Sequence, residues 1–182
     1  MPGLGPAPRL HEQMFDACVL GVDPGVARMG LACVARSQRT PVLLWADTIR
    51  TPSGMEEAER LRILAAAMRR AIEDHAPGTV ALERVAFNRN TVSALQVARA
   101  TGAVMVVAAE AGLTVDEYAP TEVKSAITGM GNADKAQVRD ALVRIHGLKA
   151  VPDQPDAADA VAIALTHLSA ARMRSVARLG TR

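Results

Sequence analysis

The sequence predicts a mixed α/β sandwich, in which a mixed five-stranded sheet carries helices on both faces. Three observations predict it. Strand-length apolar runs separated by short turns come first, and helix-length amphipathic segments then alternate with short apolar runs before the chain ends in helices. At 182 residues, 49% of them hydrophobic, the chain has the length and apolar content for one domain with a substantial core. It contains neither an internal repeat nor an interdomain linker.

The leading apolar runs are expected to form strands at 17–22, 29–35 and 42–49, and the short turns between them favour an antiparallel meander. The first strand leads into Asp23, which is followed by a turn of proline and glycine. A carboxylate in such an apolar run is costly to bury unless a cation meets it. Asp23 is therefore interpreted either as a turn residue or as a metal ligand.

A helix is expected from about residue 55 to 75, where apolar side chains recur on one face and charged side chains lie elsewhere. Pro77 and Gly78 end it. The next short apolar run is read as a strand with Glu83 at its C-terminal end. The later elements are expected to be that strand at 79–82, a helix at 91–111 ended by Gly112, a strand at 113–118, and helices at 120–128, 133–146 and 154–173.

The two ends of the chain differ in composition from the middle. Residues 1–16 are rich in proline and glycine and contain no apolar run, so they are expected to be a disordered extension rather than a signal peptide. The folded domain is expected to span 17–173, followed by a basic tail at 174–182. The longest apolar stretch, near 103–109, is far too short to cross a bilayer, so no membrane association is expected.

Charge and cysteine usage indicate the partners and the compartment. A net charge of +2 is a weak argument for an anionic partner, but the stretches 84–109 and 172–182 contain arginines and no acidic residue. Such stretches are either solvated surfaces or contacts to nucleic acid. Cys18 and Cys33 fall in two of the expected strands, which favours buried thiols over a disulfide and suits a reducing cytosol. A cytoplasmic protein is therefore expected.

Four carboxylates stand apart from the obvious solvated faces: Asp23, Glu83, Asp156 and Asp159. The last two are three residues apart on a helix that is otherwise almost wholly alanine and aliphatic, so they share one face. In a sandwich the first and fourth strands and a packed helix can converge at one edge. Four like charges gathered there repel strongly unless divalent cations neutralise them. Ligands that are all oxygen suit Mg²⁺ or Mn²⁺, and two such ions can clamp a phosphodiester.

Each of these acids also has a purely structural interpretation. Asp156 could be a first-turn residue favoured by the helix dipole, with Asp153 as the cap. Glu83 could pair with Arg84 or with Arg89. The choice between ligand and structural residue depends on whether the four acids lie together in the fold.

Two lysines and one aromatic residue add to this candidate site. Lys135 is expected in the first turn of a helix, where the dipole disfavours a cation and a phosphate partner would explain it. Lys124 precedes the same glycine loop, and a surface position is the alternative for both lysines. Phe87 lies in a polar, basic loop after Glu83, where it either packs into the core or stacks on an unpaired base.

Several sequence blocks occur in a characteristic order and spacing, and together they resemble one known family. From about Val19 to His167 the sequence is similar to the RuvC family of bacterial Holliday-junction resolvases. The resemblance implies a ribonuclease H-like fold, a homodimer, and paired symmetric nicking of a four-way DNA junction with Mg²⁺ or Mn²⁺, in recombination and repair. The blocks are Leu20–Gly25, Leu82–Val85, Asn90–Gly102, Val123-Lys124, Gly129–Lys135 and Asp156–Ala160.

The resemblance also implies roles for individual residues. The four acids match the family's metal-binding catalytic carboxylates, which hold two Mg²⁺ ions, with Mn²⁺ as the alternative; some members have His at the position of Asp156. Lys124 and Lys135 match lysines near the scissile phosphate. The loop after Glu83 matches one that inserts an aromatic residue at the junction, and Ala86 at the first position of its aromatic pair is a departure from the family. The DNA contacts implied in this loop are Arg84, Phe87, Arg89 and Asn90.

Partners follow from the implied substrate. A two-fold symmetric junction needs two symmetric cuts, which a homodimer supplies. The helix at 91–111, with small residues Ala94, Ala98 and Gly102, is the candidate interface, and core packing is its alternative. The family resemblance adds the RuvA–RuvB branch-migration complex as a partner.

Three other functions compete with junction resolution. An actin-like sugar kinase or ATPase shares the first phosphate loop, but 182 residues leave no room for the second domain that it needs. The alternatives that stay open are a ribonuclease H-like nuclease of another substrate class, such as RNA processing, and a junction-binding protein without catalysis.

Overall fold

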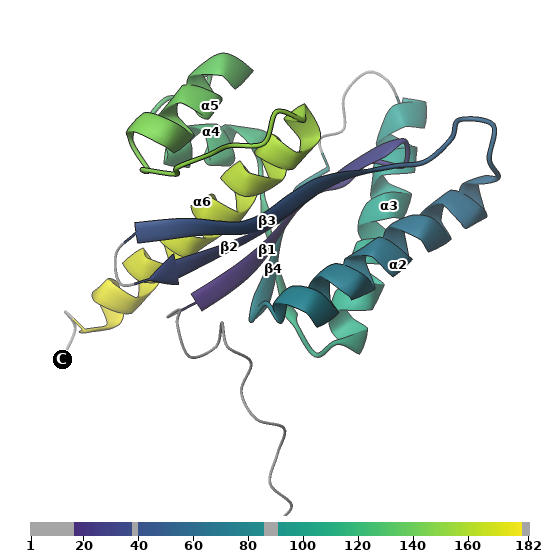
Figure 1. Ribbon diagram of the computed structural model, residues 1–182, viewed down its shortest axis with the longest axis horizontal. Helices are drawn as coiled ribbons and strands as arrows, with labels where there is room; N and C mark the ends of the chain where they lie inside the picture. Colours follow the sequence, from purple (N-terminus) through teal and green to yellow (C-terminus); the bar gives the residue numbers. More distant parts are fainter. Residues whose placement is uncertain (1–16, 38–39, 86–90, 180–182) are drawn as a thin grey trace, which may run out of the picture.

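The computed structural model describes residues 17–37, 40–85 and 91–179 and contains a five-stranded mixed sheet in the order β3-β2-β1-β4-β5 (Figure 1). The first three strands form an antiparallel meander, whereas β4 and β5 run parallel to β1. The predicted sheet and its meander are confirmed. The strands are β1 (Ala17–Asp23), β2 (Arg28–Ser37), β3 (Thr40–Arg50), β4 (Thr79–Glu83) and β5 (Thr114–Tyr118).

Helices cover both faces of the sheet, as predicted. Figure 1 shows α2 (Glu57–His75) and α3 (Thr91–Glu110) on one face, with α6 (Pro155–Leu179) on the other. The short helices α4 (Pro120–Thr128) and α5 (Lys135–Arg144) contact α6 on that second side.

Each face of the sheet has its own buried core. Side chains alternate along a strand, so Val19 belongs to the core under α6, whereas Leu20 belongs to the core under α2 and α3. The sheet therefore separates two apolar layers. Polar residues can be placed at the edge of the sheet, beyond these layers.

Two glycines allow α6 to lie unusually close to the sheet. A Cβ atom at Gly21 of β1 would overlap the carbonyl oxygen of Ala160, and one at Gly30 of β2 would overlap the carbonyl oxygen of Asp156. Because Gly30 is the register partner of Asp23, the first turn of α6 lies against the end of β1. The absence of these two side chains brings the acids of α6 to the acid of β1.

Some element boundaries differ from those predicted. The last helix continues to Leu179, through residues expected in the basic tail, because no helix-breaking residue precedes Gly180. It begins at Pro155, so Asp153 lies before its cap position, and the Asp153 carboxylate pairs with Arg139 instead. Helix α2 begins at Glu57 rather than at residue 55 but ends at His75 as predicted, where Ala76 adopts a left-handed backbone conformation with a φ of 39°.

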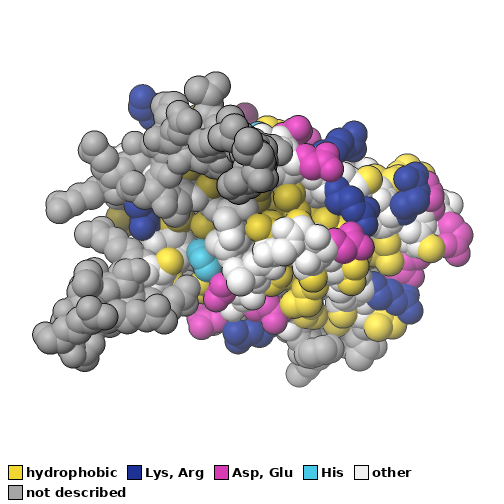
Figure 2. Space-filling model, turned by 90° about the horizontal axis from the view of Figure 1, so that it is seen from below, with side chains coloured by type: hydrophobic (Ala, Val, Ile, Leu, Met, Phe, Trp, Pro, Cys, Tyr) yellow, Lys and Arg dark blue, Asp and Glu magenta, His cyan; other side chains and the backbone are white. Residues whose placement is uncertain are grey.

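Charges on α2 and α3 are mostly arranged in pairs. The side chains of Arg69 and Glu110 meet at 3.0 Å across the two helices, and those of Arg99 and Glu57 at 2.5 Å. Figure 2 shows basic and acidic side chains interspersed toward the end of the molecule where Figure 1 places α2. Among the described residues of α2 and α3, the two signs of charge are therefore mixed.

Two sequence-based expectations concern the thiols and the membrane. Cys18 and Cys33 are free thiols on β1 and β2, the second fully buried and the first half-buried. No helix within the described residues combines the length and the apolarity needed to span a membrane.

Candidate active site

Asp23 and Glu83 lie side by side at the C-terminal ends of β1 and β4. The two strands are parallel neighbours, and Val22 is in register with Leu82 immediately before the two acids. The carboxyl groups share a hydrogen bond. Parallel pairing thus converts two distant positions in the sequence into one pair of adjacent carboxylates.

The environment of this pair raises the pKa of both carboxyl groups. Burial, followed by the charges of Glu83 and Asp159, raises the pKa of Asp23 from 3.8 to about 8. Burial also raises the pKa of Glu83, whereas the hydrogen bond to Asp23 opposes that change. A protonated Asp23 that donates to the Glu83 carboxylate accounts for both effects.

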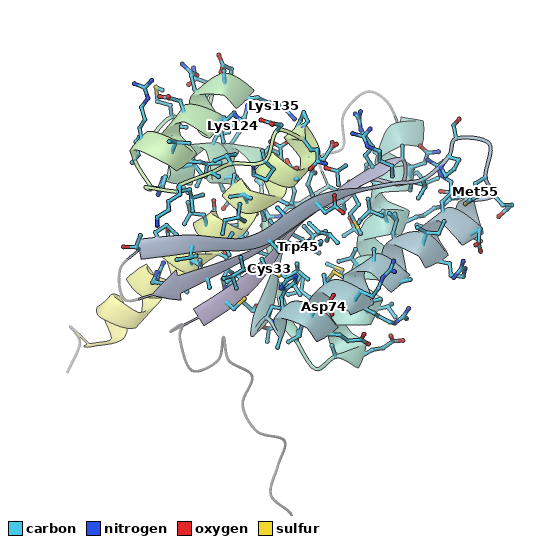
Figure 3. All side chains as sticks on the ribbon, viewed as in Figure 1. Cys33, Trp45, Met55, Asp74, Lys124 and Lys135 are labelled. Atoms are coloured by element: carbon cyan, nitrogen blue, oxygen red, sulfur yellow. The ribbon has the colours of Figure 1, made fainter. Side chains whose placement is uncertain are left out.

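Asp159 completes a cluster of three acids around one cavity. The cavity has a volume of about 270 Å³, and its apolar wall comes from α4, α5 and α6. Lys124 of α4 and Lys135 of α5 line it together with Asp23, Glu83 and Asp159. Figure 3 shows the two lysines on the α4 and α5 side of the molecule. Its remaining lining residues are Pro120, Val123, Val138, Ala162 and Ile163.

Lys135 pairs directly with one of these acids. Its Nζ donates to Oδ2 of Asp159 at 2.6 Å. This hydrogen bond is the main reason why the pKa of Lys135 is raised, and the negative charges of the nearby acids contribute less. Lys135 is the first residue of α5, with Asp134 as a capping-box residue, as the predicted position in the first turn requires. Its partner in the structure is the Asp159 carboxylate.

Asp156 lies at the margin of the cluster rather than in the cavity wall. Its charge still raises the pKa of Asp23, but its Oδ2 lies 3.4 Å from Nε of Arg28 at the start of β2. Asp156 and Asp159 share one side of α6, as predicted, yet they meet different cations. Sequence reasoning did not single out Arg28, because an arginine beside a turn resembles any solvated residue.

The residues around the cavity have the chemistry of a divalent-cation site. Carboxylate oxygens are hard ligands that suit Mg²⁺ or Mn²⁺, and the raised pKa of Asp23 reflects its burial first and then the negative charge of the neighbouring acids, which such a cation would neutralise. Across the part of the chain that the structure describes, no three acidic, histidine or cysteine side chains stand close enough together to hold a metal as they are now oriented. Oδ2 of Asp159, the third acid of the cavity, is paired with Lys135 at 2.6 Å.

The predicted DNA-contact loop is described only at its start. Arg84 is exposed, donates to the carbonyl oxygen of Glu117 at 3.2 Å and lies 3.9 Å from Glu122, so it does not pair with Glu83. Phe87, Arg89 and Asn90 lie outside the described residues.

A buried hydrogen-bond chain fixes the turn that follows Asp23. Nε of Arg60 on α2 donates to Oγ1 of Thr51 at 2.8 Å, and that hydroxyl donates to the carbonyl oxygen of Val26 at 2.6 Å. Both side chains are buried. These two hydrogen bonds connect the turn between Asp23 and Arg28 to helix α2 on the other side of the sheet.

A second arginine holds the segment before α6. Arg139 of α5 donates to the carbonyl oxygens of Val151 and Pro152 and pairs with Asp153 at 2.8 Å. This segment leads directly into the turn of α6 that carries Asp156, so Arg139 helps set the position of both α6 acids.

Comparison with known proteins gives one consistent answer. The family profile described as crossover junction endodeoxyribonuclease RuvC matches residues 19–167. The crossover junction endodeoxyribonuclease RuvC of Nocardia farcinica is 45% identical over 150 residues, which cover 82% of this chain and 79% of that protein. The protein of the same description from Moorella thermoacetica is 43% identical over 157 residues, 86% of this chain and 93% of that protein.

Solved structures agree with the sequence comparison. Thermus thermophilus RuvC in complex with Holliday junction substrate matches with a TM-score of 0.80 and 38% identity, over 86% of this chain and 96% of that chain. The yeast mitochondrial Holliday junction resolvase Ydc2 matches with a TM-score of 0.64 at 12% identity over 90% of this chain and 86% of that chain, a likeness of fold alone.

Proposed function

This chain belongs to the RuvC family of crossover junction endodeoxyribonucleases, and we propose that it resolves four-way (Holliday) DNA junctions by paired symmetric nicks. Nucleases of this family depend on divalent metal ions. The observation that carries the proposal is the gathering of Asp23, Glu83 and Asp159 with two lysines around one cavity at the C-terminal ends of β1 and β4.

The acids are assigned to cation binding. Asp23, Glu83 and Asp159 are the proposed ligands, and Asp156 joins them from the first turn of α6. Two Mg²⁺ ions per site are proposed, with Mn²⁺ as the alternative. When bound, such ions supply positive charge to the attacking water and to the leaving oxygen of a phosphodiester.

The lysines are assigned to the phosphate. Lys135 holds Asp159 in the metal-free protein, and it becomes available to a phosphate oxygen once Asp159 turns toward a cation. Lys124 lines the same cavity from α4, close enough for its charge to lower the pKa of Glu83. The positive charges of the two lysines beside the scissile phosphate would neutralise the negative charge that develops as the phosphodiester bond breaks.

A homodimer is proposed along the exposed side of α3. Leu95 and Val106 are 52% and 57% exposed, and Gly102 lies between them on the same side of the helix. Ala94, by contrast, is buried against the core, so it is not available to a partner chain. Two copies paired through this apolar stripe would present two active sites related by a two-fold axis, as two symmetric cuts require.

Further contacts are proposed from the family likeness. The loop of Arg84, Phe87, Arg89 and Asn90 lies next to Glu83 in the sequence, and we assign it to the DNA around the exchange point. The RuvA–RuvB branch-migration complex is the proposed protein partner. The free thiols suit a reducing compartment, and the cytoplasm is the proposed location.

A nicking assay on synthetic DNA tests the proposed function. The purified chain is mixed with a mobile four-way junction, a linear duplex of the same sequence, and an RNA hairpin, with Mg²⁺, with Mn²⁺ or with EDTA. Paired nicks at symmetric positions of the junction, dependent on the metal and absent from the duplex, are expected. Binding without cuts under both metals would leave a junction-binding protein, and preferential cutting of the RNA would support a different substrate class.

A further inference from the structure

Arg28 meets the candidate active site from a direction that neither lysine shares. Lys124 and Lys135 come from α4 and α5, whereas Arg28 is the first residue of β2. Its side chain is 59% exposed, and its Nε lies 3.4 Å from the Asp156 carboxylate. The two α6 acids are therefore each paired with a cation, Asp159 with Lys135 and Asp156 with Arg28.

The strand register places Arg28 on the active-site side of the sheet. Side chains two residues apart on a strand share a face, and Gly30 faces the first turn of α6. Gly30 is also the register partner of Asp23. Arg28 thus lies on the same face as Asp156 and next to it, with its side chain 59% exposed.

A second arginine stands directly opposite Arg28. Arg28 and Arg50 are register partners on β2 and β3, and Arg50 is exposed. Like charges directly opposite each other on neighbouring strands destabilise a sheet unless an anion lies between or beside them. Asp156 supplies that anion for Arg28.

We propose that Arg28, supported by Arg50, binds a backbone phosphate of the DNA substrate on the side of the active site opposite Lys135. The proposal rests on the proposed function, in which Asp156 turns toward a divalent cation. Once it does, Arg28 loses its carboxylate partner beside the scissile phosphate, with the exposed Arg50 next to it on β3. A phosphate of the same strand replaces that carboxylate, and the fork of guanidinium donors suits its oxygens.

Junction binding by Arg28→Ala tests this. Affinity is measured over a range of salt concentrations, with Ca²⁺ in place of Mg²⁺ and with a denaturing gel confirming uncut DNA, and again in EDTA. One lost phosphate contact lowers the salt slope by about 0.9 and the affinity by about eightfold at 0.1 M salt. The loss of affinity is expected to be larger with Ca²⁺ than in EDTA. In EDTA the Arg28 side chain is already paired with the Asp156 carboxylate and is less available to a phosphate. Arg28→Lys is expected to keep part of the affinity.

Arg69→Ala is the matched control, because Arg69 is also an exposed arginine paired with one carboxylate, on α2 far from the cavity. It should leave affinity and salt slope unchanged. If Arg28→Ala binds junctions with the wild-type salt slope while the wild-type chain nicks them, the phosphate contact is wrong and the proposed function stands. A loss of junction affinity that is larger in EDTA than with Ca²⁺ would also overturn the proposal, because Arg28 would then act only through its ion pair with Asp156. If the wild-type chain does not nick, the proposed function itself fails.

Discussion

The carboxyl groups of Asp23 and Glu83 share a hydrogen bond at the ends of two parallel strands, although the residues are far apart in the sequence. One proton between two acids is a stable arrangement only while no cation is bound. Asp23 and Glu83 are therefore the pair that we propose to hold a divalent ion, which would replace this shared proton.

The stability of the metal-free protein should fall as the pH rises. The pKa of Asp23 is about 8 in the folded chain and 3.8 without the fold, so the folded state binds the extra proton between these values. Stability from this group is complete below about pH 4 and is lost as the pH rises to 8, with a total on the order of a few kcal/mol. Urea unfolding in EDTA from pH 5 to pH 9 measures it. Asp23→Asn should flatten the dependence, and an unchanged slope in that variant would contradict the assignment.

Asp23→Asn should abolish metal-dependent nicking while junction binding survives. The amide cannot supply the negative charge that a divalent cation needs, but it fills the same space, so the fold is kept. Single-turnover nicking and gel-shift affinity are measured on the same junction. Asp74→Asn, an exposed acid on α2, is the control and should cut normally. Cutting by Asp23→Asn at the wild-type rate would remove Asp23 from the metal site.

Lys135→Ala should slow nicking by about a hundredfold, the usual loss when one group that stabilises a transition-state charge is removed. It should not weaken metal binding, because it frees Asp159 from its 2.6 Å ion pair. Nicking rates and Mn²⁺ titration separate the two effects. Lys149, which is exposed beyond α5, gives the control variant Lys149→Ala. A rate equal to that of the control would make Lys135 a surface residue.

The sequence was informative where local chemistry is unusual. Asp23 and Glu83 each follow an apolar strand, and Asp159 lies in an alanine-rich helix, so their residue types already point to a site. The strand order and the fit of α6 then decide which of them meet. Asp156, predicted with the other three, lies outside the cavity wall because its turn of α6 faces β2.

Other features could not be predicted, because they depend on contacts between distant segments. Gly21 and Gly30 look like ordinary strand glycines until α6 is seen to pass over them. Arg28 has no local signal, since its role depends on the neighbouring strand and on the first turn of α6. The pairing of Lys135 with Asp159 was not predicted either, because it depends on how α5 packs against α6, whereas the dipole argument pointed to a phosphate.

Gly30→Ala should disrupt the active site by moving α6. The added methyl group would overlap the carbonyl oxygen of Asp156, a backbone atom that cannot rotate away. A loss of about 1–3 kcal/mol in the free energy of unfolding is expected, together with weaker Mn²⁺ binding. Denaturant unfolding and metal titration measure the two. Gly54→Ala, where a Cβ meets nothing within 4 Å, should change neither, and equal effects of the two substitutions would refute the close-packing explanation.

Thr51→Val should loosen the turn after Asp23. The valine fills the same volume but leaves Nε of Arg60 and the carbonyl oxygen of Val26 without their hydroxyl partner, at a cost of about 1–3 kcal/mol. Hydrogen exchange of the Ala27 and Arg28 amides should rise more than that of the strand centre. The exposed Thr121 supplies the control Thr121→Val. Equal stability of both variants would show that the hydroxyl does not hold the turn.

Replacing the two exposed apolar residues of α3 should separate the proposed dimer. The double variant Leu95→Glu, Val106→Glu places two carboxylates on α3 of each protomer. A two-fold interface would therefore bring four negative charges together in a surface from which water is excluded. Both side chains are more than half exposed in the single chain, which leaves its fold unaffected. Sedimentation equilibrium should change from dimer to monomer, and symmetric nicking should give way to single unpaired cuts. Ile145→Glu alters an apolar residue that is 67% exposed next to α5 and should remain dimeric. A double variant that stays dimeric would place the interface on another surface, whereas a monomeric wild-type chain would exclude the dimer under the conditions used.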